Sequence, residues 1–235
     1  MQDLGGAFVE ALRLIVRLDR DLLEIVGLSL RVSLSAVALA ALIGLPLGAV
    51  VAICRFPGKG LAVATLNTFM GLPPVVVGLV VYLMLSRAGP LGELGLLYTP
   101  SAMVVAQTVL VTPIVAALAR QTVEDMRVEY WEQLHAFGVG TAGMVATLLW
   151  EARLSLVTVL LAGFGRAVAE VGAVIIVGGN INHVTRVMTT AIALETSKGD
   201  LDLALGLGIV LLAIVLGVNA LASGLRSSVA RHSHT

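Results

Sequence analysis

The sequence predicts an all-α integral membrane protein, because it is strongly apolar and contains five long apolar stretches. Hydrophobic residues make up 58% of the chain and charged residues 13%, with a mean hydropathy of +0.99. A soluble domain carries charge on roughly a quarter of its residues. An open sheet cannot satisfy its backbone hydrogen bonds in lipid, so helices are the expected elements.

Each apolar stretch is long enough to cross a bilayer. A hydrocarbon core about 30 Å thick needs about 20 helical residues. The stretches run from about Leu28 to Ile53, Leu61 to Leu85, Ser101 to Ala119, Leu154 to Val177 and Leu203 to Leu225. Small residues recur along them, which suits close helix packing in lipid. We therefore expect a transmembrane domain over residues 26–225 and a cytoplasmic tail over 226–235.

Residues 1–25 have a different pattern from the five apolar stretches. Charged side chains interrupt every apolar run there, and no small-residue cleavage site of a signal peptide follows. Apolar residues such as Phe8, Leu12 and Ile15 recur at helical spacing, which predicts an amphipathic helix lying at the membrane interface. A simple helical extension of the first span explains the same pattern, and both interpretations stay open.

The orientation follows from basic residues in the short loops. With the N-terminus outside, the inward segments carry seven: Arg55, Lys59, Arg120, Arg127, Arg153, Arg226 and Arg231. The outward loops then carry three: Arg87, Arg186 and Lys198. The bias predicts a multi-pass protein of the cell (inner) membrane with its N-terminus outside and its C-terminus in the cytoplasm.

The sequence lacks the residue patterns that several classes of function require. The net charge is zero and the basic residues are scattered, which argues against nucleic acid as a partner. Cys54 is the one cysteine, and the chain has no phosphate-binding loop, no H-E-x-x-H and no G-x-S-x-G. We therefore expect no enzyme activity, no cofactor and no metal site. Five spans are few for a complete pathway, so a second copy of the chain is the expected partner.

The longest polar interruption, residues 120–153, contains both tryptophans. Within it, Glu132, Gln133 and Leu134, then three residues and Gly138, resemble the E-A-A-x-x-x-G pattern on the cytoplasmic loop of ATP-binding cassette (ABC) importer permeases. The resemblance implies a short surface helix that docks on an ATPase, with a glycine at the reversal. The implied contact residues are Glu132, Gln133, Leu134, His135, Ala136, Phe137 and Gly138.

This segment departs from the family pattern in two places. Gln133 and Leu134 replace alanines, and no proline follows Leu148 and Leu149. The alternative is an amphipathic surface helix whose Tyr130, Trp131 and Phe137 merely lie among the lipid headgroups.

A narrower resemblance covers roughly residues 26–225. The runs WEARLSL, LAGFGRAVAEVGAVIIVGGNI and TRVMTTAIALETSKGDL look like the tungstate permeases, and FPGKGL with GLPPVVVGL is similar to the molybdate permeases. The resemblance implies the type I ABC importer permease fold, a homodimer, a cytoplasmic ABC ATPase dimer, an extracytoplasmic oxyanion-binding protein and inward transport of tungstate or molybdate. The alternatives are a permease for another oxyanion such as sulfate, or a membrane scaffold that only recruits a cytoplasmic partner.

Two groups of polar residues are candidates for the translocation pathway. Arg166 and Glu170 stand four residues apart in an apolar span, where charges are costly. They form a structural ion pair, or Arg166 faces the pathway and offsets the charge of a passing dianion. The second group can donate hydrogen bonds to an oxyanion, or forms an ordinary exit loop: Asn180, Thr185, Arg186, Thr189 and Thr190.

Overall fold

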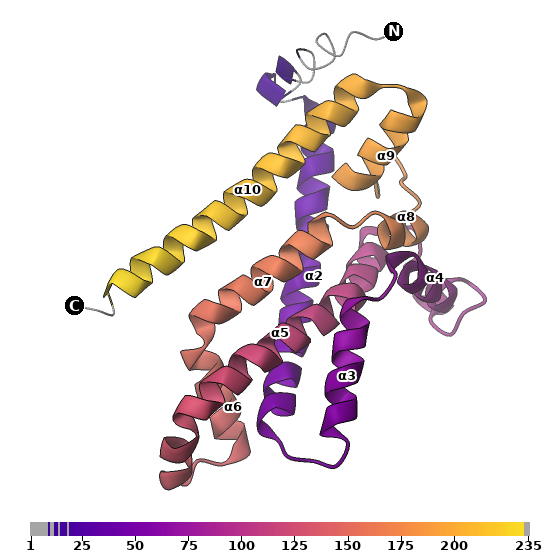
Figure 1. The fold of residues 1–235 in the computed structure, drawn as a ribbon. Helices are drawn as coiled ribbons and strands as arrows, with labels where there is room; N and C mark the ends of the chain where they lie inside the picture. The colour runs from indigo at the N-terminus through magenta and orange to yellow at the C-terminus, as the bar shows by residue number, and fades with distance from the viewer. Residues whose placement is uncertain (1–8, 10–11, 14, 18, 233–235) are drawn as a thin grey trace. The chain divides into compact units, whose positions relative to one another are not determined.

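Helices make up nearly all the regular structure of the chain (Figure 1). The structure, a computed structural model, describes residues 9, 12–13, 15–17 and 19–232. Its elements are α2 (Arg20–Ile53), α3 (Lys59–Met70), α4 (Pro74–Leu85), the 3-10 turn η1 (Gly92–Leu94), α5 (Pro100–Ala136), α6 (Thr141–Glu151), α7 (Arg153–Val168), α8 (Gly172–Gly178), α9 (Met188–Lys198) and α10 (Leu201–His232). No strand occurs in the described residues, so the predicted all-α class is confirmed.

Three of the described helices are long and apolar enough to cross a membrane: α2, α5 and α10 over residues 201–221. Two helix pairs, α3 with α4 and α6 with α7, are together long and apolar enough to cross a membrane, but each pair is bent at a short break. The described chain therefore has three spans, or up to five if each pair counts as one. The number of predicted spans equals the upper figure, but the predicted fourth span, from about Leu154 to Val177, is wrong in its bounds. It runs across the break after Val168, and the helix pair found here is α6 with α7.

The helix starts follow from local sequence. Asp19 precedes α2, and its Oδ1 accepts the backbone N–H groups of Asp21 at 3.0 Å and Leu22 at 3.2 Å. Those groups have no partner inside the helix, so the carboxylate caps it. Pro74 and Pro100 stand at the first positions of α4 and α5, where a proline loses no helical hydrogen bond.

The N-terminal region overlaps the first span. Helix α2 begins at Arg20, so residues 20–25 are continuous with the span that was expected from Leu28. Most of residues 1–19 lie outside the described part of the chain. The interfacial position of residues 1–25 stays a prediction.

The chain forms two compact units, and α2 and α5 each contribute to both. The first unit contains α2 up to Ser35, α4, α5 up to Gln107, and α8, α9 and α10 to Leu221. Helices α4 and α8 lie side by side in it (Figure 1). A Cβ at Gly78 would come within 2.7 Å of Ala173 Cα, so only glycine permits this approach.

The second unit contains α2 from Ala36, α3, α5 from Thr108, and α6 with α7. Helices α6 and α7 meet at a bend of 77°. Small residues again allow close packing: a Cβ at Gly163 would lie 3.1 Å from Val111 Cγ1 and 3.2 Å from Val115 Cγ2. Gly48 of α2 lies still closer to α5, directly against the backbone of Ala116.

We predict that Gly48→Ala destabilises the protein, whereas Gly27→Ala in the same helix does not. A Cβ at Gly48 would collide with the Ala116 carbonyl oxygen and approach Arg120 N to 2.8 Å, whereas a Cβ at Gly27 would meet nothing within 4 Å. Overpacking of this kind costs about 1–3 kcal/mol, and alanine in an open helix position is neutral or better. Thermal unfolding of both variants in detergent measures the difference. Equal midpoints would contradict the packing described here.

Candidate functional site

The predicted coupling segment, residues 132–138, forms the end of a long helix rather than a separate short one. Helix α5 continues without a break to Ala136, so the region expected to be a loop from residue 120 is helical over its first half. Gly138 then adopts a φ of 67°, a conformation that favours glycine. Its N–H donates to His135 O at 3.0 Å, and Val139 N–H donates to Leu134 O at 3.1 Å. This pair of bonds is a Schellman motif, which reverses the chain into α6.

The side chains of the segment differ in exposure. Leu134 is half-buried and packs on a cluster of buried side chains, whereas Glu132, Gln133 and His135 are exposed. Phe137 is 83% exposed, directly at the reversal. Its ring is therefore left uncovered by the described part of the chain.

Trp131 fixes the end of α5 through stacking. The Arg127 guanidinium carbon lies 4.2 Å from the centre of the Trp131 ring, on the preceding helical turn. The His135 ring lies 4.3 Å from the same ring on the following turn. Arg55, just after α2, lies 5.7 Å away. The tryptophan therefore contacts cations from two elements of the same unit.

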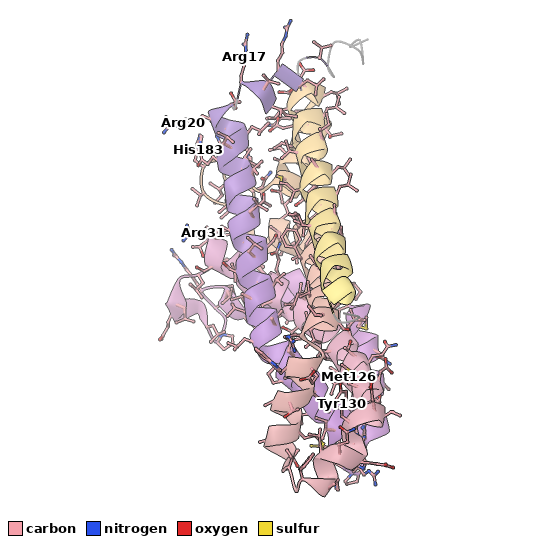
Figure 2. The ribbon with its side chains drawn as sticks, turned by 90° about the vertical axis from the view of Figure 1, so that its left-hand side faces the viewer. Arg17, Arg20, Arg31, Met126, Tyr130 and His183 are labelled. Carbon is pink, nitrogen blue, oxygen red and sulfur yellow. The ribbon has the colours of Figure 1, made fainter. Side chains whose placement is uncertain are left out.

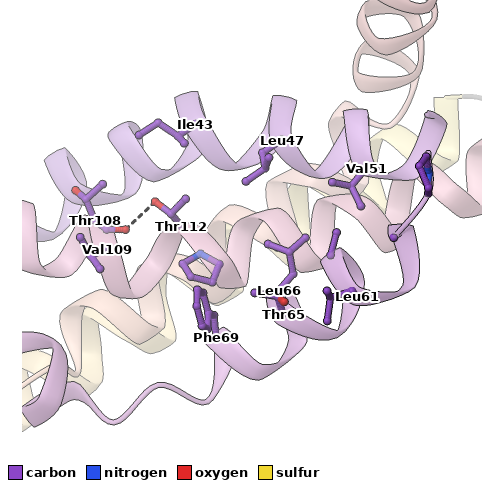
Figure 3. Close-up of a pocket in the computed structure, with 14 residues that line it drawn as sticks. Ile43, Leu47, Val51, Leu61, Thr65, Leu66, Phe69, Thr108, Val109 and Thr112 are labelled. Atoms are coloured by element: carbon purple, nitrogen blue, oxygen red, sulfur yellow. Dashed lines mark hydrogen bonds between the residues drawn. The ribbon is translucent and has the colours of Figure 1, made fainter. Parts of the chain in front are cut away.

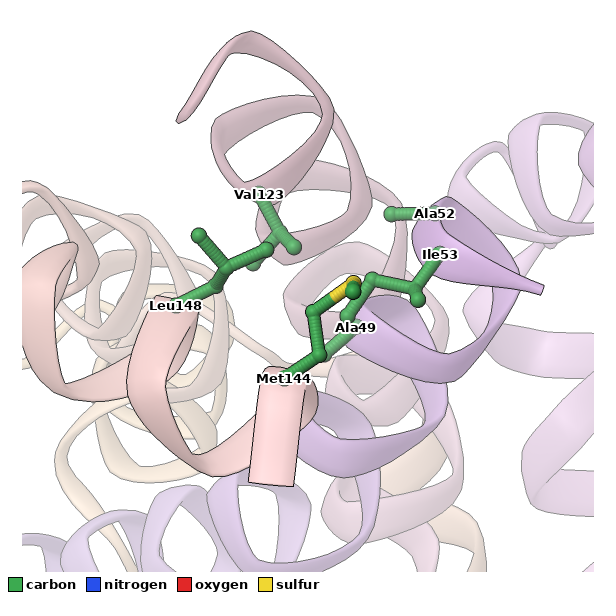
Figure 4. Close-up of a cluster of buried hydrophobic side chains, with 6 residues drawn as sticks. All are labelled: Ala49, Ala52, Ile53, Val123, Met144 and Leu148. Atoms are coloured by element: carbon green, nitrogen blue, oxygen red, sulfur yellow. The ribbon is translucent and has the colours of Figure 1, made fainter. Parts of the chain in front are cut away.

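A cluster of buried side chains from α2, α5 and α6 supports this stack (Figure 4). Its members are Ala49, Ala52, Ile53, Val123, Met144 and Leu148. Beside it, Ile53, Arg55, Trp131, His135 and Met144 help to line an open pocket of about 580 Å³. The exposed residues of the coupling segment thus lie next to a packed cluster of buried side chains.

The carboxyl end of α2 is closed by two cations. Ala52 O accepts hydrogen bonds from Lys59 Nζ at 2.7 Å and Arg127 Nη1 at 3.1 Å. Glu124 pairs with Arg120 and lies 3.8 Å from Lys59 Nζ. Cations at a helix C-terminus satisfy unpaired carbonyls and complement the helix dipole. These contacts join α2, α3 and α5 within the second unit.

Arg166 and Glu170 do not share a helix, in contrast to the sequence-based expectation. Helix α7 ends at Val168, and Glu170 lies in the break before α8. Its side chain is 3% exposed, and its Oε1 accepts the Ala173 N–H at 3.0 Å. Its carbonyl oxygen accepts the Thr189 hydroxyl at 2.7 Å. Glu170 therefore caps α8 and joins this break to α9, while Arg166 is half-buried on α7.

The predicted donor group at residues 180–190 is largely engaged with the backbone. The hydroxyl of Thr185, 1% exposed, donates to Gly178 O at 2.6 Å and accepts the Ile181 N–H at 2.9 Å. Asn180 has a φ of 49°, and its Oδ1 accepts the Thr190 hydroxyl at 2.9 Å. These polar side chains hold the α8–α9 connection together, while its residues 181–184 are exposed.

Arg186 has a nearby counter-charge. Its Nη1 lies 3.7 Å from Glu195 Oε1, and Glu195 is buried and also accepts Lys198 Nζ at 3.1 Å. The carboxylate therefore offsets part of the positive charge that Arg186 would offer to an anion.

His183 lies beside the start of α2, as Figure 2 shows next to Arg20. Its Nδ1 is 2.9 Å from Glu24 Oε2, and Asp21 is close enough for the three groups to place ligand atoms within 4.8 Å of one another. All three side chains are exposed to solvent. The contact joins α2 to the α8–α9 connection on the surface of the first unit.

A pocket of about 780 Å³ in the second unit is an apolar groove (Figure 3). It is lined by α2, α3 and α5, including Leu47, Leu66 and Phe69. Its polar groups are threonines, of which Thr112 donates to Thr108 O at 2.7 Å. None of its 14 described lining residues is charged. Such a lining suits hydrocarbon and does not suit an anion.

Sequence reasoning missed the groups that anchor the end of α5. A signal was present, since Arg127, Trp131 and His135 follow one another at i, i+4 spacing and share a helix face. Val123, Tyr130 and Leu134 also recur at helical intervals and face the buried cluster. The capping role of Glu170 had no comparable signal, because an apolar run continues on both sides of it.

Comparisons with known proteins show a match along most of the chain. The family model described as "Binding-protein-dependent transport system inner membrane component" matches residues 44–233. A "Probable anion ABC transporter permease protein" of Haloferax volcanii is 44% identical over 210 residues, covering 87% of this chain and 90% of the relative. The "Tungstate uptake system permease protein TupB" of Peptoclostridium acidaminophilum is 40% identical over 220 residues, covering 94% and 96%. The "Molybdenum transport system permease protein ModB" of Escherichia coli K12 is 30% identical over 191 residues, covering 75% and 82%.

The buried hydroxyl of Thr185 yields a stability prediction. Thr185→Val keeps the side-chain shape but leaves the Gly178 carbonyl and the Ile181 N–H without this partner. Leaving buried groups unpaired costs about 1–3 kcal/mol each, so thermal unfolding in detergent should begin at a clearly lower temperature.

Thr68→Val is the matched control for Thr185→Val. Thr68 is exposed, and its hydroxyl donates only to Ala64 O within its own helix, so the control should unfold with the wild type. A Thr185→Val protein as stable as the Thr68→Val protein would show that the bonded connection is not formed.

Proposed function

This chain belongs to the family of binding-protein-dependent transport system inner membrane components, and from that membership we propose that it carries tungstate, or the nearly isosteric molybdate, into the cytoplasm. It is a transport protein of the ABC class and not an enzyme. The energy would come from ATP hydrolysis in a separate ATPase, since the sequence contains no phosphate-binding loop of its own. The observation that carries the proposal is the similarity to a tungstate permease along 94% of the chain.

The proposed transport complex contains further proteins. Permeases of this family act with an ATPase and a substrate-binding protein. We propose a homodimer of this chain, a cytoplasmic ATPase dimer and an extracytoplasmic oxyanion-binding protein. The homodimer follows from the span count, because three to five spans are few to enclose a pathway alone.

The proposed orientation places the N-terminus outside and the C-terminus in the cytoplasm. The excess of basic residues in the inward segments, seven against three in the outward loops, supports this orientation.

Residues Glu132 to Gly138 are the proposed contact with the ATPase. Three features support this role: the segment ends a continuous helix, Gly138 reverses the chain, and Phe137 is exposed at the reversal. The stack of Arg127, Trp131 and His135 would pass a displacement of the segment to the end of α2.

Arg166 is a proposed charge within the pathway, because it is half-buried on α7, where a charge among apolar side chains is costly. Arg186 is a second candidate, and its charge is partly offset by Glu195. The hydroxyls of Thr185, Thr189 and Thr190 are engaged by the protein, so they would shape the pathway rather than bind the anion.

Uptake of radiolabelled tungstate tests the proposed function. We expect ATP-dependent accumulation in proteoliposomes that contain this chain, its ATPase and the binding protein. Excess molybdate should compete and sulfate should not. Preferential sulfate uptake would favour a sulfate permease, and ATPase recruitment with no anion flux would favour a scaffold; either result rejects the proposal.

The coupling role of Glu132 is tested by charge reversal. Glu132→Lys should lower the number of tungstate ions imported per ATP hydrolysed by at least tenfold, because the exposed carboxylate belongs to the ATPase contact. Glu129→Lys is the matched control: Glu129 is exposed on the same helix one turn earlier and should keep the wild-type ratio. Gly138→Pro should also uncouple, since proline cannot adopt a φ of 67°. Full coupling in both Glu132→Lys and Gly138→Pro would remove the segment from the mechanism.

A further inference from the structure

A pocket of about 530 Å³ lies at the end of α4, within the first unit. It is lined by Tyr82, Leu85, Ser86, Arg87, Gly92, Gly95, Leu97 and Tyr98. Its walls thus come from the last turn of α4, the turn η1 and the residues that lead into α5. The volume is in the range of small-molecule sites, and its lining combines apolar side chains with convergent polar groups.

Arg87 is the charged residue among these lining residues. No ion pair or hydrogen bond of its guanidinium occurs among the residues that the structure describes, in contrast to Arg186, which faces Glu195. A guanidinium presents a planar fork of donors that matches two oxygens of an oxyanion. Its charge is therefore available to a ligand.

Tyr98 is held in an unusual backbone conformation beside the pocket. Its φ is 61°, which is rare for a bulky residue and requires support from neighbouring structure. The Tyr98 N–H donates to Val177 O of α8 at 2.9 Å, and the ring lies so close to Gly179 that a Cβ there would come within 2.9 Å of Cδ1. Helix α8 and the following glycine thus fix the ring.

The two tyrosines of the pocket contact each other. Their ring centres are 6.4 Å apart in an edge-to-face arrangement. A hydrogen bond with Tyr82, and secondarily charge repulsion from it, raises the pKa of Tyr98 above its usual value. Tyr98 therefore stays protonated at neutral pH and is a hydrogen-bond donor rather than a negative charge.

We propose that this pocket is a reception site for a tetrahedral oxyanion, in which Arg87 supplies the charge and the hydrogen-bonded phenol pair of Tyr82 and Tyr98 supplies the remaining O–H donor. The inference rests on the proposed function, which supplies the ligand class and puts this end of α4 on the outer side. No carboxylate lines the pocket to repel an anion. The pocket also contains a charged side chain and two phenols, unlike the uncharged groove of the second unit. An anion released by the binding protein would be held here before it enters the spans.

Direct binding tests the site. Radiolabelled tungstate is dialysed to equilibrium against the purified permease–ATPase complex without the binding protein. We expect saturable binding, weakened at least tenfold by Arg87→Gln and less by Arg87→Lys. Tyr98→Phe removes one donor while keeping the ring and should weaken binding about threefold to tenfold.

Arg20→Gln is the matched control, because Arg20 is an exposed arginine of the same unit that does not line the pocket. It should bind tungstate as the wild type does. The inference is overturned if the wild-type complex shows no saturable binding, or if Arg87→Gln binds tungstate normally. Normal tungstate binding with weaker docking of the binding protein would instead assign Arg87 to an acidic group of that partner.

The tungstate-uptake assay separates the two proposals. If wild-type vesicles import tungstate but the Arg87→Gln complex binds tungstate as the wild type does, the reception site is rejected and the proposed function is not. Wild-type vesicles that import no tungstate would reject the proposed function itself.

Discussion

The constraint on which this structure depends is that backbone N–H and C=O groups at helix ends must find partners in surroundings that contain little water. The long apolar helices satisfy themselves, but each break leaves groups unpaired. Lys59 and Arg127 close the end of α2 at Ala52 O. Glu170 closes the start of α8, and Thr185 closes its end at Gly178 O. These four polar side chains thus act where helices begin or end.

This constraint changes how polar residues in an apolar sequence should be interpreted. A threonine or glutamate inside a span suggests contact with the transported ion, because its burial is costly. In this chain Glu170, Thr185 and Thr189 are buried because they replace water at helix breaks. Arg87, by contrast, has no hydrogen bond or ion pair to another described residue, so its charge is available to an anion.

The sequence predicted the helical class, the span count at its upper limit and the glycine at the reversal after α5, because hydropathy and glycine conformation are local properties. It did not predict the break after Val168, since the residues from Val171 to Gly178 are as apolar as those before them. Nor could it predict the pocket at Arg87, which depends on Tyr98 being held at a φ of 61° by α8, far along the chain. Local pattern determines where helices form, but tertiary contacts determine where they stop.

The continuity of α5 has a mechanical consequence for the proposed coupling. A 37-residue helix is about 55 Å long, well beyond a hydrocarbon core of about 30 Å, so in the proposed orientation its polar end would project past the lipid. Pro113 removes one backbone hydrogen bond within this helix, but no proline follows it up to Ala136. If residues 120–136 formed a loop, rotation about its backbone bonds would prevent a displacement of Glu132 from reaching the rest of α5. A hydrogen-bonded helix whose last turns are stacked through Trp131 and tied by Arg127 to the end of α2 moves as one body. In the proposed orientation the polarity of this segment would mark where the helix leaves the membrane, and its unbroken helical structure would allow it to transmit force.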